Sequence, residues 1–124
     1  MPEDSAGYHE PLEQLGPNIR DMHRAVVSVV EELQAIDWYA QRVAASQDSE
    51  LRAILQHNAD EEKEHAAMLL EWIRRHDPTF EAALRKFLFR SGSIVAAEEH
   101  GESAGNANGG GDRASIGSLR EVRR

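Results

Sequence analysis

The sequence contains no cysteine among its 124 residues. Disulfides, thiolate metal sites and cysteine nucleophiles are therefore excluded, and the cytoplasm is the expected setting. The chain also lacks any run of about 18 apolar residues, so no membrane span is expected. Its acidic N-terminus is followed by no apolar segment of the kind that a secretory signal needs.

Positive charge is scarce as well. The 14 lysines and arginines are outnumbered by 22 aspartates and glutamates, which gives a formal net charge of −8. This balance argues against a nucleic-acid partner, because binding to a phosphate backbone depends on Lys and Arg. It fits a protein that attracts cations, and it fits equally well a surface that only keeps the protein soluble.

Proline is nearly absent from the part of the chain that we expect to fold. Residues 1–17 form a polar segment with several helix breakers, whereas residues 18–90 are dense in helix formers and contain one proline. The C-terminal residues are rich in Gly, Ser, Ala and Asn. Since this composition cannot bury much apolar surface, we expect a flexible linker over residues 91–114.

Apolar residues recur every three or four positions and predict the helices. The first helix begins near Pro17 or Asn18, and its pattern breaks at residues 45–49. The second ends at Asp77, because a residue before proline disfavours the helical region. Asp77 then caps a short third helix that covers one end of the hairpin. The apolar positions are Met22, Val26, Val29, Leu33, Ile36, Ala40 and Val43, then Leu51, Leu55, Leu69 and Trp72, then Phe80, Leu84, Phe87 and Leu88. We therefore predict an all-α fold, an antiparallel two-helix hairpin plus a short C-terminal helix.

The second helix carries polar residues in the middle of its apolar seam, namely Asn58, Glu62 and His65. Glu and His are costly in a buried seam unless they are paired or bind a metal. Glu62 and His65 are three residues apart, so their side chains project from the same face of the helix. Glu-x-x-His at this spacing is the ligand pair of carboxylate di-iron bundles.

The first helix offers a partner in Glu32, which lies beside its apolar stripe. If the turn centres on Gln47, an antiparallel hairpin pairs residue n with residue 94 − n, and Glu32 then faces position 62. A di-iron bundle needs a Glu from each of two helices and Glu-x-x-His from each of the other two. One chain supplies half of this set. We therefore expect a two-fold dimer, a ferritin-like four-helix bundle, to hold two iron ions between Glu32, Glu62 and His65 of both copies.

The sequence resembles the encapsulated ferritins, small iron-oxidising proteins that are packaged inside encapsulin nanocompartments. The resemblance covers most of residues 9–90 and rests on the stretches His9–Glu13, His23–Leu33, Asp37–Tyr39 and Asp60–Met68. It implies a homo-oligomeric ring of dimers with the iron sites at the dimer interfaces. It also implies that Glu32, Glu62 and His65 are iron ligands, that Tyr39 lies close to the metals with Trp38 beside the site, and that iron is mineralised in the surrounding shell.

The sequence departs from the family's pattern at one position. The family has carboxylates at the positions of Glu31 and Gln34, where they attract iron at an entry site. Glu31 is present in this chain, but position 34 is a glutamine. The resemblance therefore implies an entry site at Glu31 that is weakened or relies on other groups, while the ligand set itself is intact.

The C-terminus carries three apolar residues in otherwise polar sequence. Ile116, Leu119 and Val122 recur every three residues within the segment 115–124. This resembles the cargo-loading peptides that dock on the inner wall of encapsulin shells, and apolar anchors on a flexible tether suit such docking. We expect this segment to bind the shell protein, which places the protein inside an encapsulin compartment in the cytoplasm. An unspecialised tail is the alternative.

The function that we predict is a ferroxidase that oxidises Fe²⁺ with dioxygen and feeds iron storage. Two alternatives stay open: a metal-free helical adapter, and a rubrerythrin-like peroxide reductase, although the chain has no cysteine-based electron-transfer site. His57, Glu61 and Glu64 share another face, which is either solvated or binds a weaker cation. Trp72 is interpreted as a packing residue, and His9, His23, His76 and His100 have no recognisable partner in the sequence.

Overall fold

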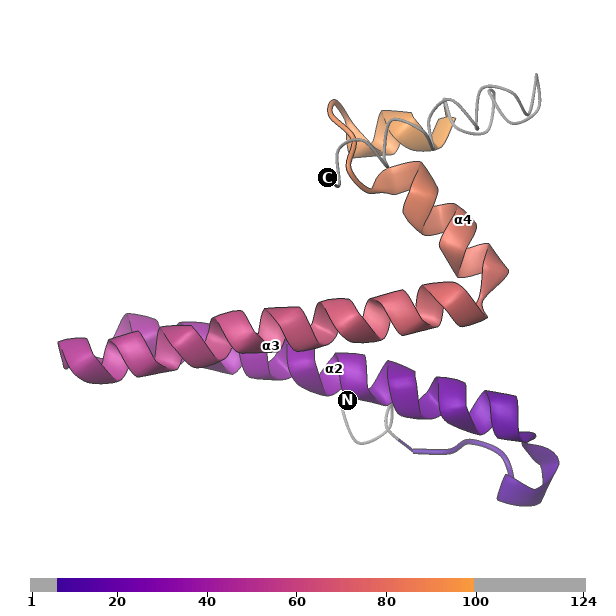
Figure 1. Cartoon of the computed structure of the whole chain (residues 1–124), viewed down its shortest axis with the longest axis horizontal. Coiled ribbons are helices and arrows are strands. Elements are labelled where there is room, and N and C mark those ends of the chain that lie inside the picture. The colour runs from indigo at the N-terminus through magenta and orange to yellow at the C-terminus, as the bar shows by residue number, and fades with distance from the viewer. Residues whose placement is uncertain (1–6, 100–124) are drawn as a thin grey trace. The chain divides into compact units, whose positions relative to one another are not determined.

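The computed structural model describes residues 7–99, and within this range it is helical and contains no strand. Its elements are η1 (Leu12–Gln14), α2 (Pro17–Ala45), α3 (Ser49–His76) and α4 (Pro78–Phe87) (Figure 1). The all-α prediction is therefore confirmed. None of the helices in residues 7–99 is both long and apolar enough to cross a membrane. The chain divides after His76 into two units, which are described separately.

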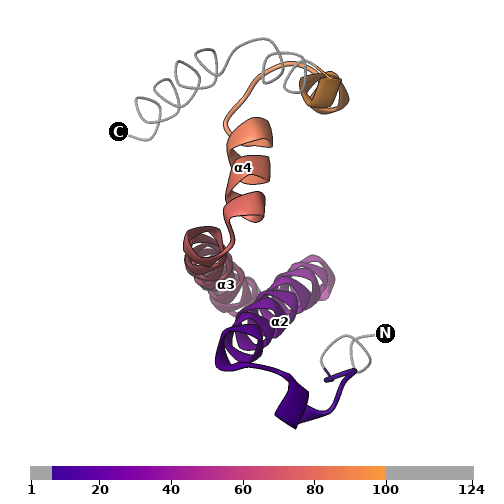
Figure 2. The same ribbon diagram turned by 90° about the vertical axis from the view of Figure 1, so that its right-hand side faces the viewer.

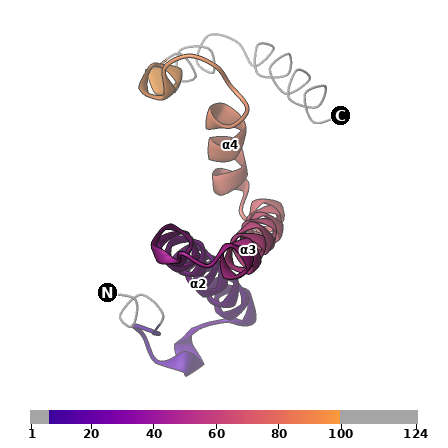
Figure 3. The ribbon, with the colours of Figure 1, turned by 90° about the vertical axis from the view of Figure 1, so that its left-hand side faces the viewer.

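The first unit is a hairpin of two long helices. α2 has 29 residues and α3 has 28, so each is ~42 Å long at 1.5 Å per residue. The two helices lie side by side along most of their length, as the two end-on views show (Figures 2 and 3). α2 begins with Pro17 at its first position, directly after Gly16. The predicted start is therefore confirmed, since proline suits the first turn of a helix.

A connection of only three residues, 46–48, joins the two helices. Asp48 caps α3, because its Oδ1 accepts a hydrogen bond of 2.8 Å from the backbone N–H of Leu51. Arg52 reaches back across the turn and its Nε donates to the carbonyl of Val43 at 3.1 Å. This bond occupies one of the carbonyls that the end of α2 leaves without a helical partner. Hydrogen bonds thus fix the connection at the end of α2 and at the start of α3, and its short length makes the two helices antiparallel neighbours.

Small residues dominate the contact between α2 and α3. The buried residues are Ala25 on α2 and Ala59, Ala66 and Ile73 on α3. The three on α3 are spaced by seven, which keeps them on one face of the helix. Much of the predicted apolar stripe stays uncovered in the single chain, since Val26 is 43 % exposed and Leu33 is 55 % exposed. The hairpin therefore has a thin core, and dimerisation stays a prediction.

The segment before α2 folds back against the first turns of that helix. A guanidinium nitrogen of Arg20 donates to the carbonyl of Leu12, which lies in η1. The rings of Tyr8 and His23 stack with their centroids 4.1 Å apart. His23 thus has a partner that was not recognisable in the sequence, because the stacked ring comes from a segment with no regular pattern.

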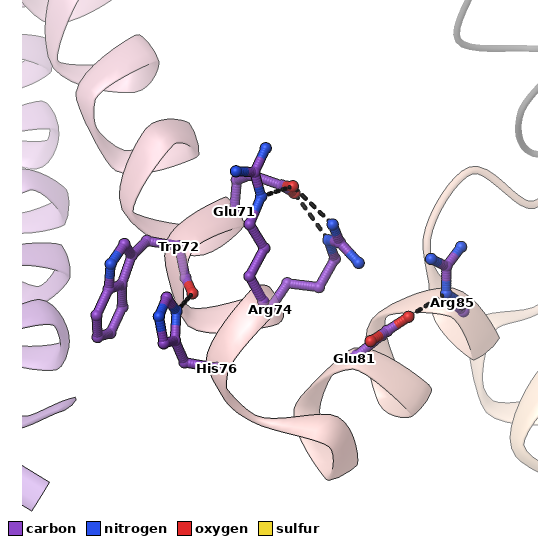
Figure 4. Close-up of polar contacts among 7 residues, drawn as sticks. Glu71, Trp72, Arg74, His76, Glu81 and Arg85 are labelled. Carbon is purple, nitrogen blue, oxygen red and sulfur yellow. Dashed lines mark hydrogen bonds and ion pairs between the residues drawn. The ribbon is translucent and has the colours of Figure 1, made fainter. Parts of the chain in front are cut away.

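The second unit contains α4, which begins as predicted. Asp77 is its N-cap, with Oδ1 accepting from the backbone N–H of Phe80 at 2.9 Å, and Pro78 is the first helical residue. Within the helix, Arg85 Nε donates to Glu81 at 2.8 Å (Figure 4). The predicted packing of this helix over one end of the hairpin stays a prediction.

A correction concerns the start of the predicted linker. Residues 94–99 are helical rather than irregular. The side chain of Ser93 caps this helix by accepting from the backbone N–H of Ala96 at 3.1 Å, and the turn before it uses Gly92 at a φ of +88°. A capped, alanine-containing turn overrides the glycine-rich composition here. Residues 100–114 of the predicted linker and the segment 115–124 lie outside the described residues.

The last turns of α3 carry a network of charged side chains. The carboxylate of Glu71 accepts from Arg74 Nε at 2.8 Å and Nη2 at 2.7 Å (Figure 4). It also accepts from Arg75 Nε at 2.8 Å. The hydrogen bonds from Arg74 and then Arg75 lower the pKa of Glu71 from 4.5 to about 2. Arginine near a helix C-terminus is also favourable for the helix dipole.

This lowered pKa predicts a pH dependence. Because the folded pKa lies below the unfolded value, the stability that Glu71 contributes is complete above pH ~4.5 and is lost as the pH falls towards ~2. Glu71→Gln should remove this part of the acid-induced loss of helix, measured by circular dichroism. The effect should be small, since partly exposed ion pairs are screened by solvent. Glu64→Gln, at an exposed position of α3, is the control and should leave the acid profile unchanged.

Candidate metal centre

The hairpin brings three potential metal ligands together, one from α2 and two from α3. Glu32, Glu62 and His65 each offer a ligand atom, and these atoms all lie within 4.8 Å of one another. The register explains why. The three-residue connection is centred on Gln47, so an antiparallel pairing places Glu32 opposite position 62. His65 joins them because it lies three residues, or about one helical turn, after Glu62.

The distances within the group are short. His65 Nδ1 lies 3.0 Å from Glu62 Oε1 and 3.7 Å from Glu32 Oε2. The side chains of Glu32 and Glu62 are 24 % and 23 % exposed, and that of His65 is 43 % exposed. The group is therefore open on one side to an incoming ion, while the helices shield the other side from water and strengthen its electrostatic interactions.

The two carboxyl groups have opposite pKa shifts. Burial, followed by the hydrogen bond with Glu62, raises the pKa of Glu32. Hydrogen bonds with His65 and then with Glu32 lower the pKa of Glu62. The hydrogen bond with Glu62 raises the pKa of His65. The raised pKa values of Glu32 and His65 mean that both groups hold a proton more readily than usual, so protons compete with a cation for these ligand atoms.

The donor set fits iron. Two carboxylates and one imidazole are hard to borderline ligands, and carboxylate and imidazole donors together suit Fe²⁺ and Fe³⁺. The set contains no thiolate, which would favour softer metals. It is also incomplete, because three side chains are half of the four carboxylates and two imidazoles of a di-iron bundle.

The remaining predicted residues lie on α2, the helix that carries Glu32. Tyr39 is half-buried and lies two turns after Glu32 on α2, where the Arg42 guanidinium carbon sits 5.3 Å from the centre of its ring. Its closeness to metals stays a prediction. Glu31 is exposed, and its charge contributes to the raised pKa of Glu32. Gln34 is half-buried three residues after Glu31. The entry site at Glu31 therefore also stays a prediction.

Other side chains singled out in the sequence are not part of this group. His57, Glu61 and Glu64 are all exposed, and within residues 7–99 the three-ligand cluster is the one at Glu32. His76 stacks on Trp72 with the ring centroids 3.9 Å apart and donates from Nδ1 to the Trp72 carbonyl at 2.8 Å. The spacing of four residues between Trp72 and His76 was the signal that could have revealed this pair.

A family model described as EncFtn-like matches residues 7–91, which include both long helices and the whole candidate metal centre. The chain belongs to the EncFtn-like family. This confirms the resemblance and supports an iron-related role for the protein.

Several known proteins are similar to this member of the EncFtn-like family. A Rhodospirillum rubrum protein named encapsulated ferritin-like protein is 56 % identical over 89 % of this chain and 78 % of its own length. A Thermotoga maritima ferritin-like protein is 50 % identical over 85 % of this chain and 91 % of its own length. A crystal structure of a Nitrosomonas europaea protein has a TM-score of 0.69 and 60 % identity, covering 71 % of this chain and 97 % of that one.

The opposed pKa shifts predict how the metal-free site responds to substitution. His65→Ala should raise the pKa of Glu62, because it removes the hydrogen bond that lowers it most, and should raise that of Glu32 further. Carboxyl ¹³C chemical shifts followed through a pH titration measure both. Glu61→Gln is the matched control: it should lower the pKa of His65 and leave that of Glu62 in place. An unchanged Glu62 titration in His65→Ala would contradict this account of the site.

Proposed function

We propose that this protein is a ferroxidase, which oxidises Fe²⁺ to Fe³⁺ with dioxygen at a di-iron site shared by two copies of the chain. The observation that carries the proposal is the convergence of Glu32, Glu62 and His65 within 4.8 Å. The residue types and their helical spacing match half of the ligand set of a carboxylate di-iron bundle.

The missing half points to a second copy. A two-fold axis beside the open side of the group supplies a second Glu32, Glu62 and His65 and completes a four-helix bundle. The thin core of the hairpin supports the same arrangement, since residues such as Leu33 stay more than half exposed in one chain. Further association of such dimers gives the ring that the family resemblance implies.

The chemistry uses iron as the substrate. Two Fe²⁺ ions pass two electrons to one dioxygen, which takes up two protons and leaves as hydrogen peroxide. The carboxylates of Glu32 and Glu62 neutralise the positive charge and favour Fe³⁺, while His65 fixes the geometry of the site. Iron binding competes with protons at Glu32 and His65, whose pKa values are raised.

The names of two relatives support a further proposal about where the protein is located in the cell. The Rhodospirillum rubrum relative is named an encapsulated ferritin-like protein, and a Myxococcus xanthus protein that is 38 % identical over 60 % of this chain is named an encapsulin nanocompartment cargo protein. We propose that this protein is likewise packaged in an encapsulin shell in the cytoplasm, where the oxidised iron is mineralised and stored. The segment 115–124 is the proposed shell-binding peptide.

The ligands are tested by substitution. Glu32→Ala, Glu62→Ala and His65→Ala should each reduce the rate of Fe²⁺ oxidation at least a hundredfold, because each removes a ligand from a shared site. Ferric absorbance and oxygen consumption measure the rate, and circular dichroism checks that the helices remain. Glu64→Ala, at an exposed position of α3, is the control and should react like the wild type. Wild-type oxidation by Glu62→Ala would show that the site lies elsewhere, and a lack of stoichiometric iron binding by the wild type would favour a metal-free adapter.

Assembly should depend on iron. Since each chain owns half a site, Fe²⁺ binds the dimer and not the monomer, and it stabilises the dimer by mass action. Analytical ultracentrifugation under anaerobic conditions should show a shift to larger species when Fe²⁺ is added. The shift should be absent in Glu62→Ala. A monomer that binds two irons per chain would contradict the shared site.

The tail is tested separately from the metal site. Deletion of residues 115–124 should leave assembly and iron oxidation intact but prevent loading into a co-expressed encapsulin shell. Leu119→Asp should have nearly the same effect, because it would bury a charge in an apolar docking site. In a companion experiment, residues 106–124 are fused to an unrelated soluble protein. If this fusion stays outside the shell while the truncated chain is still loaded, the shell-binding segment lies in the helical domain.

A further inference from the structure

Sulfur is scarce in this chain, and one sulfur atom belongs to a residue beside the candidate metal centre. The sequence has no cysteine and three methionines, of which Met22 and Met68 lie in the described part of the chain. Met68 follows the ligand His65 by three residues on α3, whereas Met22 precedes Glu32 by ten residues on α2. At 1.5 Å per residue these separations are ~4.5 Å and ~15 Å along the helices. Met68 is therefore the methionine that adjoins the ligands.

Met68 continues a row of side chains that turns away from α2. Glu62, His65 and Met68 are spaced by three residues, so each is rotated about 60° around α3 from the one before it. Their exposure rises in the same order. The side chain of Glu62 is 23 % exposed, that of His65 is 43 % exposed, and Met68 is 65 % exposed. The exposed end of this row is the open side of the metal centre, and Met68 borders it.

Met68 also lies in an open depression on α3 that a small molecule can enter. Apolar atoms form most of the surface of this depression. The rings of Trp72 and His76 stack there with their centroids 3.9 Å apart, so two oxidisable rings share the depression with the thioether (Figure 4). The residues that line it are Ala67, Met68, Glu71, Trp72, Arg75 and His76.

The proposed iron oxidation supplies an oxidant beside this thioether. Two Fe²⁺ ions and one dioxygen yield hydrogen peroxide, and peroxide that diffuses from the ligands first meets the side chains that border them. The sulfur of Met68 forms a bond to one peroxide oxygen while the O–O bond breaks, and the second oxygen leaves as water with both protons. The thioether is oxidised to the sulfoxide and the peroxide is reduced, so no further reactant is needed.

We propose that Met68 is a modification site, oxidised to methionine sulfoxide by the hydrogen peroxide that the metal centre releases, and that it consumes this peroxide before the peroxide reaches Trp72 and His76. The inference rests on the proposed function, because the ferroxidase reaction is the source of the peroxide. Oxidation of Met68 leaves the ligand set of the metal centre intact. It is also reversible, since sulfoxide reductases return methionine sulfoxide to methionine.

The test follows this modification in the full-length protein by peptide mass spectrometry. Fe²⁺ is added in air, the iron is then removed with a chelator, and the gain of one oxygen atom is measured at Met68 and at Met22, which is half-buried and serves as the internal reference. Met68 should be oxidised about fivefold more than Met22, because it borders the source of the peroxide. The preference should persist when catalase removes peroxide from the bulk solution. Glu62→Ala, given the same iron and oxygen, should lose it.

A second variant tests the protective role of Met68. Met68→Leu keeps an apolar side chain of similar volume but removes the sulfur atom. It should oxidise the first additions of Fe²⁺ at the wild-type rate. Over repeated additions its rate should fall about twofold faster than that of the wild type, with oxygen gained at Trp72 or His76. Met22→Leu is the matched control and should behave like the wild type.

The rate of iron oxidation, measured in the same samples, separates this inference from the proposed function. Normal iron oxidation with equal modification of Met68 and Met22 would overturn the inference and leave the proposed function in place. The same holds if catalase abolishes the modification of Met68, or if Met68→Leu lasts as long as the wild type with Trp72 and His76 unmodified. A wild type that oxidises no Fe²⁺ would overturn the proposed function, and this inference with it.

Discussion

The register between two antiparallel helices is the constraint on which the rest of this structure depends. Asp48 caps α3 and Arg52 binds the last turn of α2, so the connection is held at three residues. Moving the centre of the turn by one residue along the chain would shift the pairing by two positions, or ~3 Å along the helices. Glu32 and Glu62 would then no longer face each other at the distance that one metal ion can bridge.

The same pairing leaves the hairpin unfinished in two respects. Alanines let α2 and α3 approach closely, but they bury little apolar area, and large side chains such as Leu33 and Met68 remain exposed. The ligand group is also half of a di-iron set. In the proposed dimer, a single association would cover the exposed apolar side chains and also complete the ligand set of the metal site. Both features therefore favour a second copy of the chain as the partner.

The electrostatics of the site favour a cation. Glu32 has a raised pKa because it is partly buried beside Glu62, and the hydrogen bond with His65 lowers the pKa of Glu62. Two carboxylates this close repel each other, which favours binding of either a proton or a cation at the pair. The same three side chains therefore favour a bound cation, in competition with protons.

The local pattern of the sequence determined the two long helices, their ends at the three-residue turn and before Pro78, and the polar break at Glu62 and His65 in an apolar seam. These follow from neighbouring residues, because helix periodicity, capping and proline act within one or two turns. The Tyr8–His23 stack, the exposure of the apolar stripe and the capped helix at 94–99 were decided only by the tertiary structure or by local turn geometry. Each depends on which surfaces meet across the chain or on how a turn closes, and composition carries neither. The approach of Glu32 to His65 was determined partly by the sequence and partly by the tertiary structure. The helical spacing predicted it, but only the folded turn set the distance of 3.7 Å between Glu32 Oε2 and His65 Nδ1.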